Sequence, residues 1–307
     1  MEFIIHPEYP YDFELSIKIF LSNGSTRKYE NNKYKRLINV NEIPILIELE
    51  SIGTVDHPEL KLILKSNSEI SKLNGNLALE TVIKMFNLNF DLKSFYDDVK
   101  NEKILSKLVY NLYGLKSPAT ASVFEALVDA IVEQQISLRV AHSIEQKIIK
   151  KYGGTLNIDG HTYYAYPTPK QLNNAPFDEL RACGLTLRKT EYIKSISKDI
   201  KEGKLDLEKY RQYYDGQKIM NELCKIRGIG RWTAEFVMIR GLNRQESLPA
   251  DDIGIRRVIS HYYCDDKRIS SNEARKIAEK WGKWKGLAAY YLIIAEILDI
   301  NISKEIN

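Results

Sequence analysis

The chain of 307 residues is long enough for two or three domains, each with a core of its own. Its 44% hydrophobic and 28% charged residues are typical of soluble proteins, and no apolar run is long enough to cross a membrane. Because the first residues lack the pattern of a signal peptide, we expect a cytoplasmic protein. The 3 cysteines are too few for a disulfide framework or a four-cysteine iron–sulfur cluster, and their scatter argues against a zinc site.

The net charge is only +4, and the positive excess lies entirely within residues 117–307. A basic excess is what a phosphate-binding face requires, but many proteins that never touch nucleic acid carry a margin this small. The charge alone therefore does not establish a nucleic-acid partner.

The first 87 residues predict a small antiparallel sheet with one helix. Side chains alternate between apolar and polar from Phe13 to Ile19, which predicts a half-buried strand that ends at Ser22-Asn23-Gly24. Two more strands and a helix are predicted in the same part, at residues 45–49, 60–64 and 77–86. No pattern in this part indicates chemistry.

From residue 88 onward the apolar spacing is helical almost throughout, so the predicted fold class is α+β. We divide the chain into four parts: a sheet domain at 1–87, a helix and linker at 88–115, a helical domain at 116–240, and a C-terminal helical domain at 241–307.

Two connections between predicted helices carry polar or basic residues. The first contains Gln134 and Gln135, and on its residue pattern it is simply a polar connection. In the second, Gly184 is followed by Arg188 and Lys189 at the start of a helix. These basic residues indicate either a phosphate contact or an ordinary helix cap.

The most informative stretch runs from Leu223 to Asp252. Apolar spacing on both sides of Gly228-Ile229-Gly230 predicts two helices joined by a tight turn. Glycine allows positive φ and a close approach of another molecule to the backbone. The second helix would begin with free N–H groups and a positive dipole end, which suit a phosphate. A Gly-x-Gly turn between helices also occurs without any ligand.

The longer string around this turn is more specific. Gly-Ile-Gly-Arg-Trp-Thr-Ala at residues 228–234, preceded by Leu223 and Ile226, resembles the hairpin of the helix-hairpin-helix DNA glycosylase superfamily. The nearest similarity is to its alkylpurine branch, the 3-methyladenine DNA glycosylase II type. That branch keeps an aspartate about twenty residues after the tryptophan, and Asp252 lies in that place, 20 positions after Trp232.

The resemblance implies roles for residues around the hairpin. It places the DNA backbone against Gly228, Ile229, Gly230, Arg231 and Thr233. It also implies a Na⁺ or K⁺ held by backbone carbonyls, and a side chain that wedges into the base stack. The carbonyls would be those of Cys224, Arg227 and Ile229, and the wedge would be Gln135, with Gln134 beside it. The helix at 88–115 is then expected to pack with the C-terminal helices.

A single carboxylate could carry the chemistry. Cleavage of the bond between base and sugar builds positive charge on the sugar, which an ionised carboxylate stabilises. Asp252 is the candidate, and Asp251 is the adjacent alternative. The simpler interpretation is that Asp252 only caps the helix that begins at Ile253, and both roles are compatible.

Aromatic side chains could bind the flipped base. Trp232 and Phe236 lie one turn apart on the predicted second helix, so both can face one cleft, although helical aromatics are more often core residues. Where relatives carry a further tryptophan in the last long helix, this chain has Ile293, and we take Tyr290 beside it as a third candidate.

The sequence thus predicts a monomeric, monofunctional DNA glycosylase that flips alkylated purines out of double-stranded DNA and hydrolyses the glycosidic bond. It would act in the cytoplasm on the nucleoid, without an organic cofactor. One alternative is an oxidised-guanine glycosylase with lyase activity, which would need a lysine where this chain has Trp232. The other is a DNA-binding protein without enzymatic activity.

Overall fold

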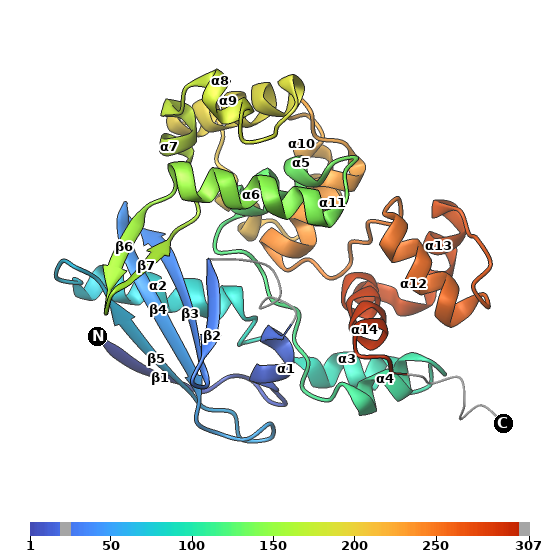
Figure 1. The fold of residues 1–307 in the computed structure, drawn as a ribbon. Coiled ribbons are helices and arrows are strands. Elements are labelled where there is room, and N and C mark those ends of the chain that lie inside the picture. Colours follow the sequence, from blue (N-terminus) through green and yellow to red (C-terminus); the bar gives the residue numbers. More distant parts are fainter. Residues whose placement is uncertain (19–25, 301–307) are drawn as a thin grey trace.

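The computed structural model describes residues 1–18 and 26–300 (Figure 1). Its N-terminal part is a five-stranded antiparallel sheet with the order β1-β5-β4-β3-β2. The strands are β1 (Glu2–Ile5), β2 (Arg27–Glu30), β3 (Lys33–Val40), β4 (Ile43–Ser51) and β5 (Leu60–Lys65). Strands β4 and β5 contain the predicted segments 45–49 and 60–64, so both of these predictions are confirmed.

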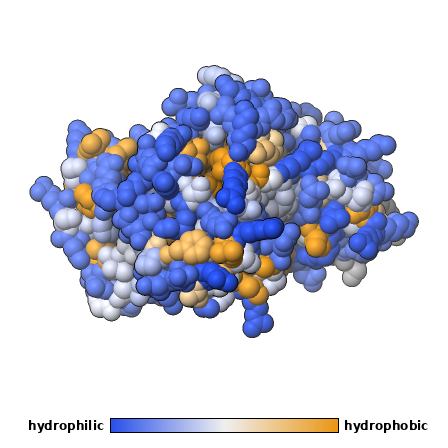
Figure 2. All heavy atoms as spheres, turned by 90° about the horizontal axis from the view of Figure 1, so that it is seen from above, coloured by the Kyte–Doolittle hydropathy of each residue, from blue (hydrophilic) through white to orange (hydrophobic). Residues whose placement is uncertain are grey.

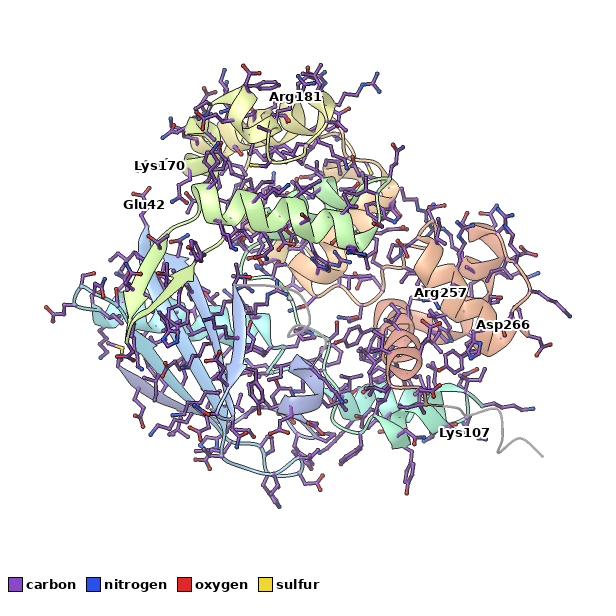
Figure 3. All side chains as sticks on the ribbon, viewed as in Figure 1. Glu42, Lys107, Lys170, Arg181, Arg257 and Asp266 are labelled. Carbon is purple, nitrogen blue, oxygen red and sulfur yellow. The ribbon has the colours of Figure 1, made fainter. Side chains whose placement is uncertain are left out.

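Each face of the sheet is covered by a different element. Helix α2 (Lys72–Met85) packs on one face and contains most of the predicted helix 77–86. A β-hairpin, β6 (Thr155–Ile158) and β7 (His161–Tyr164), reaches over the other face, where Leu156 and Tyr163 bury Leu37 and Leu46. An exposed ion pair between Glu42 and Lys170, 2.8 Å apart, also joins the sheet to the helical domain (Figure 3).

The predicted strand from Phe13 is wrong where the structure describes it. Residues Phe13–Ile17 form a short helix, α1, because the Asp12 side chain accepts a hydrogen bond from the Leu15 N–H and caps the first turn. Phe13 and Ile17 are buried against the sheet core, so one helical turn satisfies the apolar positions that alternation had suggested. The predicted strand end at residues 22–24 lies outside the described residues.

The middle of the chain forms a helical body with its own core. Its helices are α5 (Val123–Glu133), α6 (Leu138–Tyr152), α7 (Pro169–Asn174), α8 (Phe177–Arg181), α9 (Leu187–Lys201), η2 (Glu208–Gln212), α10 (Gly216–Leu223) and α11 (Arg231–Leu242). Helix α5 is the central helix, since every residue from Val123 to Val132 is buried.

A third body combines two distant segments of the chain (Figure 1). Its helices are α3 (Leu92–Val99), α4 (Leu105–Asn111), α12 (Ile253–Tyr263), α13 (Ser271–Ala278), η3 (Glu279–Trp284) and α14 (Lys285–Ile297). Aromatic rings fill the junction, with Phe95 packed against Trp284 and Tyr291.

The segment at residues 114–120 is buried, although its composition resembles that of a linker. Lys116 is completely buried, and its ammonium group donates hydrogen bonds to the carbonyls of Glu8 and Leu88. Burial lowers the pKa of Lys116 to about 8. This connection therefore fixes the sheet domain to the helical bodies.

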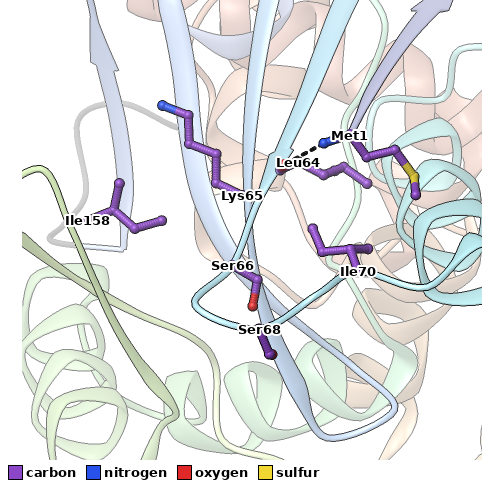
Figure 4. A pocket seen from close by; sticks show the side chains of 7 residues that line it. All are labelled: Met1, Leu64, Lys65, Ser66, Ser68, Ile70 and Ile158. Carbon is purple, nitrogen blue, oxygen red and sulfur yellow. Dashed lines mark hydrogen bonds between the residues drawn. The ribbon is translucent and has the colours of Figure 1, made fainter.

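A surface pocket lies at one end of the sheet, between β5 and the β6–β7 hairpin (Figure 4). It is lined by Leu64, Lys65, Ser66 and Ile158 together with Met1, Ser68 and Ile70. None of these residues belongs to the turn between α10 and α11 or to the helix that follows Asp252. Among the described residues, no helix is long and apolar enough to cross a membrane.

Candidate functional site

The predicted hairpin is present between α10 and α11. The turn closes through two backbone hydrogen bonds, from Ile226 to Leu223 and from Ile229 to Ile226, each 3.0 Å long. Gly228 has φ +91°, a backbone conformation that is unfavourable for residues other than glycine. Gly230 has φ −94°, so this second glycine does not use the positive φ that glycine allows. A Cβ atom at Gly230 would meet none of the described atoms within 4 Å.

Helix α11 begins without a side-chain cap. Its N-cap is Gly230, which has no side chain, and no side chain of the described residues accepts a capping hydrogen bond there. The helices α5, α6, α9 and α12 are each capped by a serine, threonine or aspartate. The first N–H groups of α11 are thus open to an anion on the exposed side of the turn, which is the geometry that binds phosphate.

The two adjacent glutamines have different positions. The Gln134 side-chain amide donates hydrogen bonds to the Gly228 carbonyl, at 3.1 Å, and to the Thr233 hydroxyl, at 3.0 Å. Gln134 and Thr233 therefore tie the loop to the hairpin instead of facing outward. Gln135 is exposed with φ +57°, so it projects from the loop as a wedge would need to.

The basic residues of α9 also differ from one another. Arg188 is exposed. Lys189 is 7% exposed, and its ammonium group donates hydrogen bonds to the carbonyls of Val132 and Gln134 at the end of α5. The expected phosphate contact by Lys189 does not agree with this position. Thr186 caps α9 by accepting a hydrogen bond from the Lys189 N–H.

Asp252 caps α12 and also contacts the hairpin helix. One carboxylate oxygen accepts a hydrogen bond from the Ile255 N–H at 3.0 Å. The other accepts one from the Trp232 indole N–H at 3.3 Å. The structure thus brings Asp252 and Trp232 together, and the capping role coexists with a carboxylate placed between α11 and α12. Asp251 turns toward Arg275 instead, at 2.9 Å.

Of the other two predicted aromatic residues, Phe236 is buried and Tyr290 is partly exposed. Phe236 is 8% exposed. Its ring centroid lies 4.6 Å from that of Trp232 and 4.3 Å from the guanidinium carbon of Arg240. Phe236 thus packs edge-to-face against the Trp232 ring. Tyr290 has no hydrogen bond or ring contact with Trp232 within the described chain, and its hydroxyl is enclosed without a partner there. Burial raises the pKa of Tyr290.

The hairpin carbonyls named for a monovalent cation fit that role in one respect. The carbonyls of Leu223 and Ile226 accept the hydrogen bonds of the turn. Among the described residues, those of Cys224, Arg227 and Ile229 accept none. Carbonyl oxygens without N–H partners are suitable ligands for Na⁺ or K⁺. No cluster of His, Cys, Asp and Glu suited to a metal occurs in residues 1–18 and 26–300.

Two ion-pair systems beside the site carry no sequence signal. Arg240, on α11, forms two hydrogen bonds of 2.7 Å with Glu133 at the end of α5. Burial opposes the charge of Arg240, but nearby carboxylates, with Glu133 the strongest, raise its pKa above the usual value. Glu235, on the same helix, is 2% exposed and pairs with Arg231 and Arg275. Arg240 lies 107 residues from Glu133, and Arg275 lies 40 residues from Glu235, so sequence spacing could not reveal these two pairs. Arg231 and Glu235 are four residues apart on the same helix.

The surface around the helical body is mostly hydrophilic, with apolar patches between the charged groups (Figure 2). Three helices each present an exposed apolar side chain at the first position: Leu138 on α6, Leu187 on α9 and Ile253 on α12. The Ile253 side chain, 76% exposed, directly follows Asp252.

The chain is similar to known proteins over most of its length. The chain is 27% identical to the DNA-3-methyladenine glycosylase of Bacillus subtilis over 272 residues, which is 88% of each protein. Among solved structures, 3-methyladenine DNA-glycosylase from Archaeoglobus fulgidus superposes with a TM-score of 0.82 at 24% identity, over 97% of this chain and 99% of the other. The predicted α+β fold class is thereby confirmed.

A second solved structure shares the fold at lower identity. It is the 8-oxoguanine glycosylase/lyase of Clostridium acetobutylicum in complex with double-stranded DNA, with a TM-score of 0.73, 19% identity, and coverage of 97% and 99%. The sequence profile of the family described as "HhH-GPD superfamily base excision DNA repair protein" matches residues 128–283, which include the hairpin and Asp252. This chain belongs to the HhH-GPD superfamily of base excision DNA repair proteins.

Proposed function

We propose that the protein is a DNA glycosylase that removes alkylated purines, such as 3-methyladenine, from duplex DNA. The observation that carries the proposal is the Asp252 carboxylate, held between the Trp232 indole and the start of α12. It lies directly beside a hairpin whose open helix end suits a phosphate. The B. subtilis relative, which matches over most of both chains, is named for this activity.

The chemistry needs little more than a fixed negative charge. As the base leaves, positive charge develops on the sugar, and an ionised carboxylate nearby stabilises it. The two hydrogen bonds of Asp252 fix its direction, and the N-terminal end of α12 favours its negative charge. A purine alkylated at N3, as in 3-methyladenine, already carries positive charge while it is attached to the sugar, so it leaves readily without protonation by a general acid.

The base must first leave the stack, which costs roughly a few kcal/mol and less for a damaged base. In this proposal Gln135 fills the gap in the duplex. Trp232 offers the aromatic surface on which an electron-poor base stacks. The open N–H groups of α11 hold the DNA backbone, and Na⁺ or K⁺ at the carbonyls of Cys224, Arg227 and Ile229 adds positive charge there.

The reaction is proposed to end at the abasic site. A lyase needs an amine that attacks the sugar carbon, and Trp232 has no such amine. The Lys189 ammonium is held by two carbonyls at the end of α5, and Lys225 is exposed before the turn. Water positioned by Asp252 is then the nucleophile. Borohydride should trap no covalent protein–DNA species, and a trapped adduct mapped to any lysine would favour the oxidised-guanine alternative.

The decisive variant is Asp252→Asn. Asparagine also caps helices, so folding should be retained, while the loss of charge should slow base excision roughly a hundredfold or more. Release of free base from methylated duplex DNA measures the effect, and binding of the same DNA should be retained. Asp91→Asn is the matched control, because Asp91 caps α3 in the same way, far from the hairpin. Unchanged excision by Asp252→Asn would contradict the catalytic assignment.

A further inference from the structure

One arginine from another helix contacts both ends of the turn that precedes Asp252. Arg275, on α13, donates a hydrogen bond of 2.9 Å to the Leu248 carbonyl at the start of the turn. It donates another, also 2.9 Å, to the Asp251 carboxylate at its end. A backbone hydrogen bond of 2.9 Å, from the Asp252 N–H to the Pro249 carbonyl, closes the turn itself.

The same guanidinium is anchored to the hairpin helix. It forms hydrogen bonds of 2.7 and 3.2 Å to the two carboxylate oxygens of Glu235. Glu235 lies on α11 three positions after Trp232, and its side chain is 3% exposed. Bidentate pairing of this kind fixes the guanidinium plane as well as its distance.

These contacts form a closed circuit around the candidate site. Asp252 contacts Trp232 directly, and Arg275 links the turn before Asp252 to Glu235 on the same helix as Trp232. The direct contact is one hydrogen bond of 3.3 Å, whereas the Arg275 contacts are shorter and more numerous. Arg275 is therefore a side chain that ties the turn before Asp252 to the hairpin helix, in addition to the burial of Leu248 and Ala250.

We propose that Arg275 is a positioning residue for base excision, which holds Asp252 at its working distance from Trp232 by clamping the Leu248–Asp251 turn to buried Glu235. This inference rests on the proposed function. Arg275 would not touch DNA or the reacting atoms. Its loss would displace the carboxylate and so reduce the rate of the chemical step, while the open end of α11 continued to bind DNA.

The first test is Arg275→Met, which keeps the length of the side chain and removes every hydrogen bond. We expect the single-turnover rate of base release to fall on the order of ten- to a hundredfold, as for a small misplacement of a catalytic group. Binding of a duplex that contains an abasic-site analogue, measured by fluorescence anisotropy, should change by less than about twofold. Arg257→Met is the matched control, because Arg257 forms an equally bidentate pair, with Glu296, between α12 and α14 (Figure 3).

A double variant separates positioning from stability. Arg275→Met leaves the buried Glu235 without its main cation, so it should also lower the melting temperature. Glu235→Gln combined with Arg275→Met removes that uncompensated charge and should recover most of the melting temperature, yet excision should stay slow. Rates are compared at a temperature where circular dichroism shows each variant folded.

Two outcomes would overturn the inference. One is wild-type excision by Arg275→Met, and the other is recovery of both melting temperature and excision rate in the double variant. The Asp252→Asn variant distinguishes this failure from a failure of the proposed function. If Asp252→Asn excises normally, the catalytic assignment is wrong. If Asp252→Asn is slow but Arg275→Met is fast, only the positioning role is wrong.

Discussion

The two glycines of the hairpin should respond differently to alanine. At Gly228 the added Cβ would lie 2.3 Å from the Tyr192 ring, and the residue has φ +91°. The backbone strain alone costs about 1–2 kcal/mol, and displacement of the ring adds about 1 kcal/mol or more. We therefore expect Gly228→Ala to lower the free energy of unfolding by roughly 2–3 kcal/mol.

Gly230→Ala should not destabilise the protein. Its φ of −94° and ψ of 179° suit any residue, and none of the described atoms lies within 4 Å of the added Cβ. Alanine reduces the entropy of the unfolded chain, a gain of about 0.4–1 kcal/mol, but it is a poorer N-cap than glycine by a similar amount, so the free energy of unfolding should change little. In the proposed function, however, the space that the Cβ fills is the space through which a phosphate reaches the first N–H groups of α11. Loss of one hydrogen bond to a charged group costs about 1.5 kcal/mol, or roughly tenfold in affinity.

Two measurements on the same variants test this reasoning. Urea unfolding gives the stability change, and fluorescence anisotropy gives the dissociation constant for damaged and undamaged duplexes at several salt concentrations. Contacts to phosphate carry no sequence information, so Gly230→Ala should weaken both duplexes alike. Gly160→Ala is the control for strain alone, because Gly160 has φ +75° with no described atom near its Cβ. If Gly230→Ala binds DNA like the wild type, the backbone of the turn is not the phosphate site.

Three further predictions concern the loop before α6 and the core beneath it. Gln135→Ala should slow excision from duplex DNA with little change in melting temperature, whereas Gln134→Ala should lower the melting temperature because it removes both contacts to the hairpin. Lys189→Met should cost about 1–3 kcal/mol of stability, measured by urea unfolding, since two carbonyls of α5 and the adjoining loop lose their donor. Burial, with Glu145 and Glu125 nearby, raises the pKa of Asp129 well above its usual value. The folded state therefore keeps a proton that the unfolded state releases above about pH 4, and stability falls as pH rises toward the folded pKa. Asp129→Asn removes this dependence, so it should be more stable than the wild type at pH 8 by about 1 kcal/mol or more and equal to it near pH 3. A variant that is less stable than the wild type at pH 8 would contradict this reasoning.

The turn between α10 and α11 and the start of α12 could be predicted from the sequence, because each depends on residues that are close together in the chain. The turn depends on Gly228, and the start of α12 depends on an aspartate just before an apolar helix. The spacing and the family resemblance singled out Trp232 and Asp252, and the structure places their side chains in contact, which neither one predicted.

The failures come from contacts between distant segments. Lys189 stands at a helix start like any phosphate-binding residue, but the end of α5 lies close enough to bind its ammonium group. Phe236 has the spacing of a cleft residue, but Arg240 covers its ring. The alternating segment at Phe13 became a helix because Asp12 caps it, and alternation over so few residues does not distinguish a strand from one helical turn.

In the proposed function, DNA binding and chemistry use two helix ends in different ways. At α11 the N-cap is a glycine, so the end remains open for an anion from outside. At α12 the N-cap is Asp252, so the end is occupied by the protein's own carboxylate, whose second oxygen is directed to Trp232. An external phosphate would be repelled by that carboxylate, whereas a sugar that develops positive charge would be attracted. The same physical feature, a helix N-terminus, therefore distinguishes the two parts of a nucleotide by the residue that caps it.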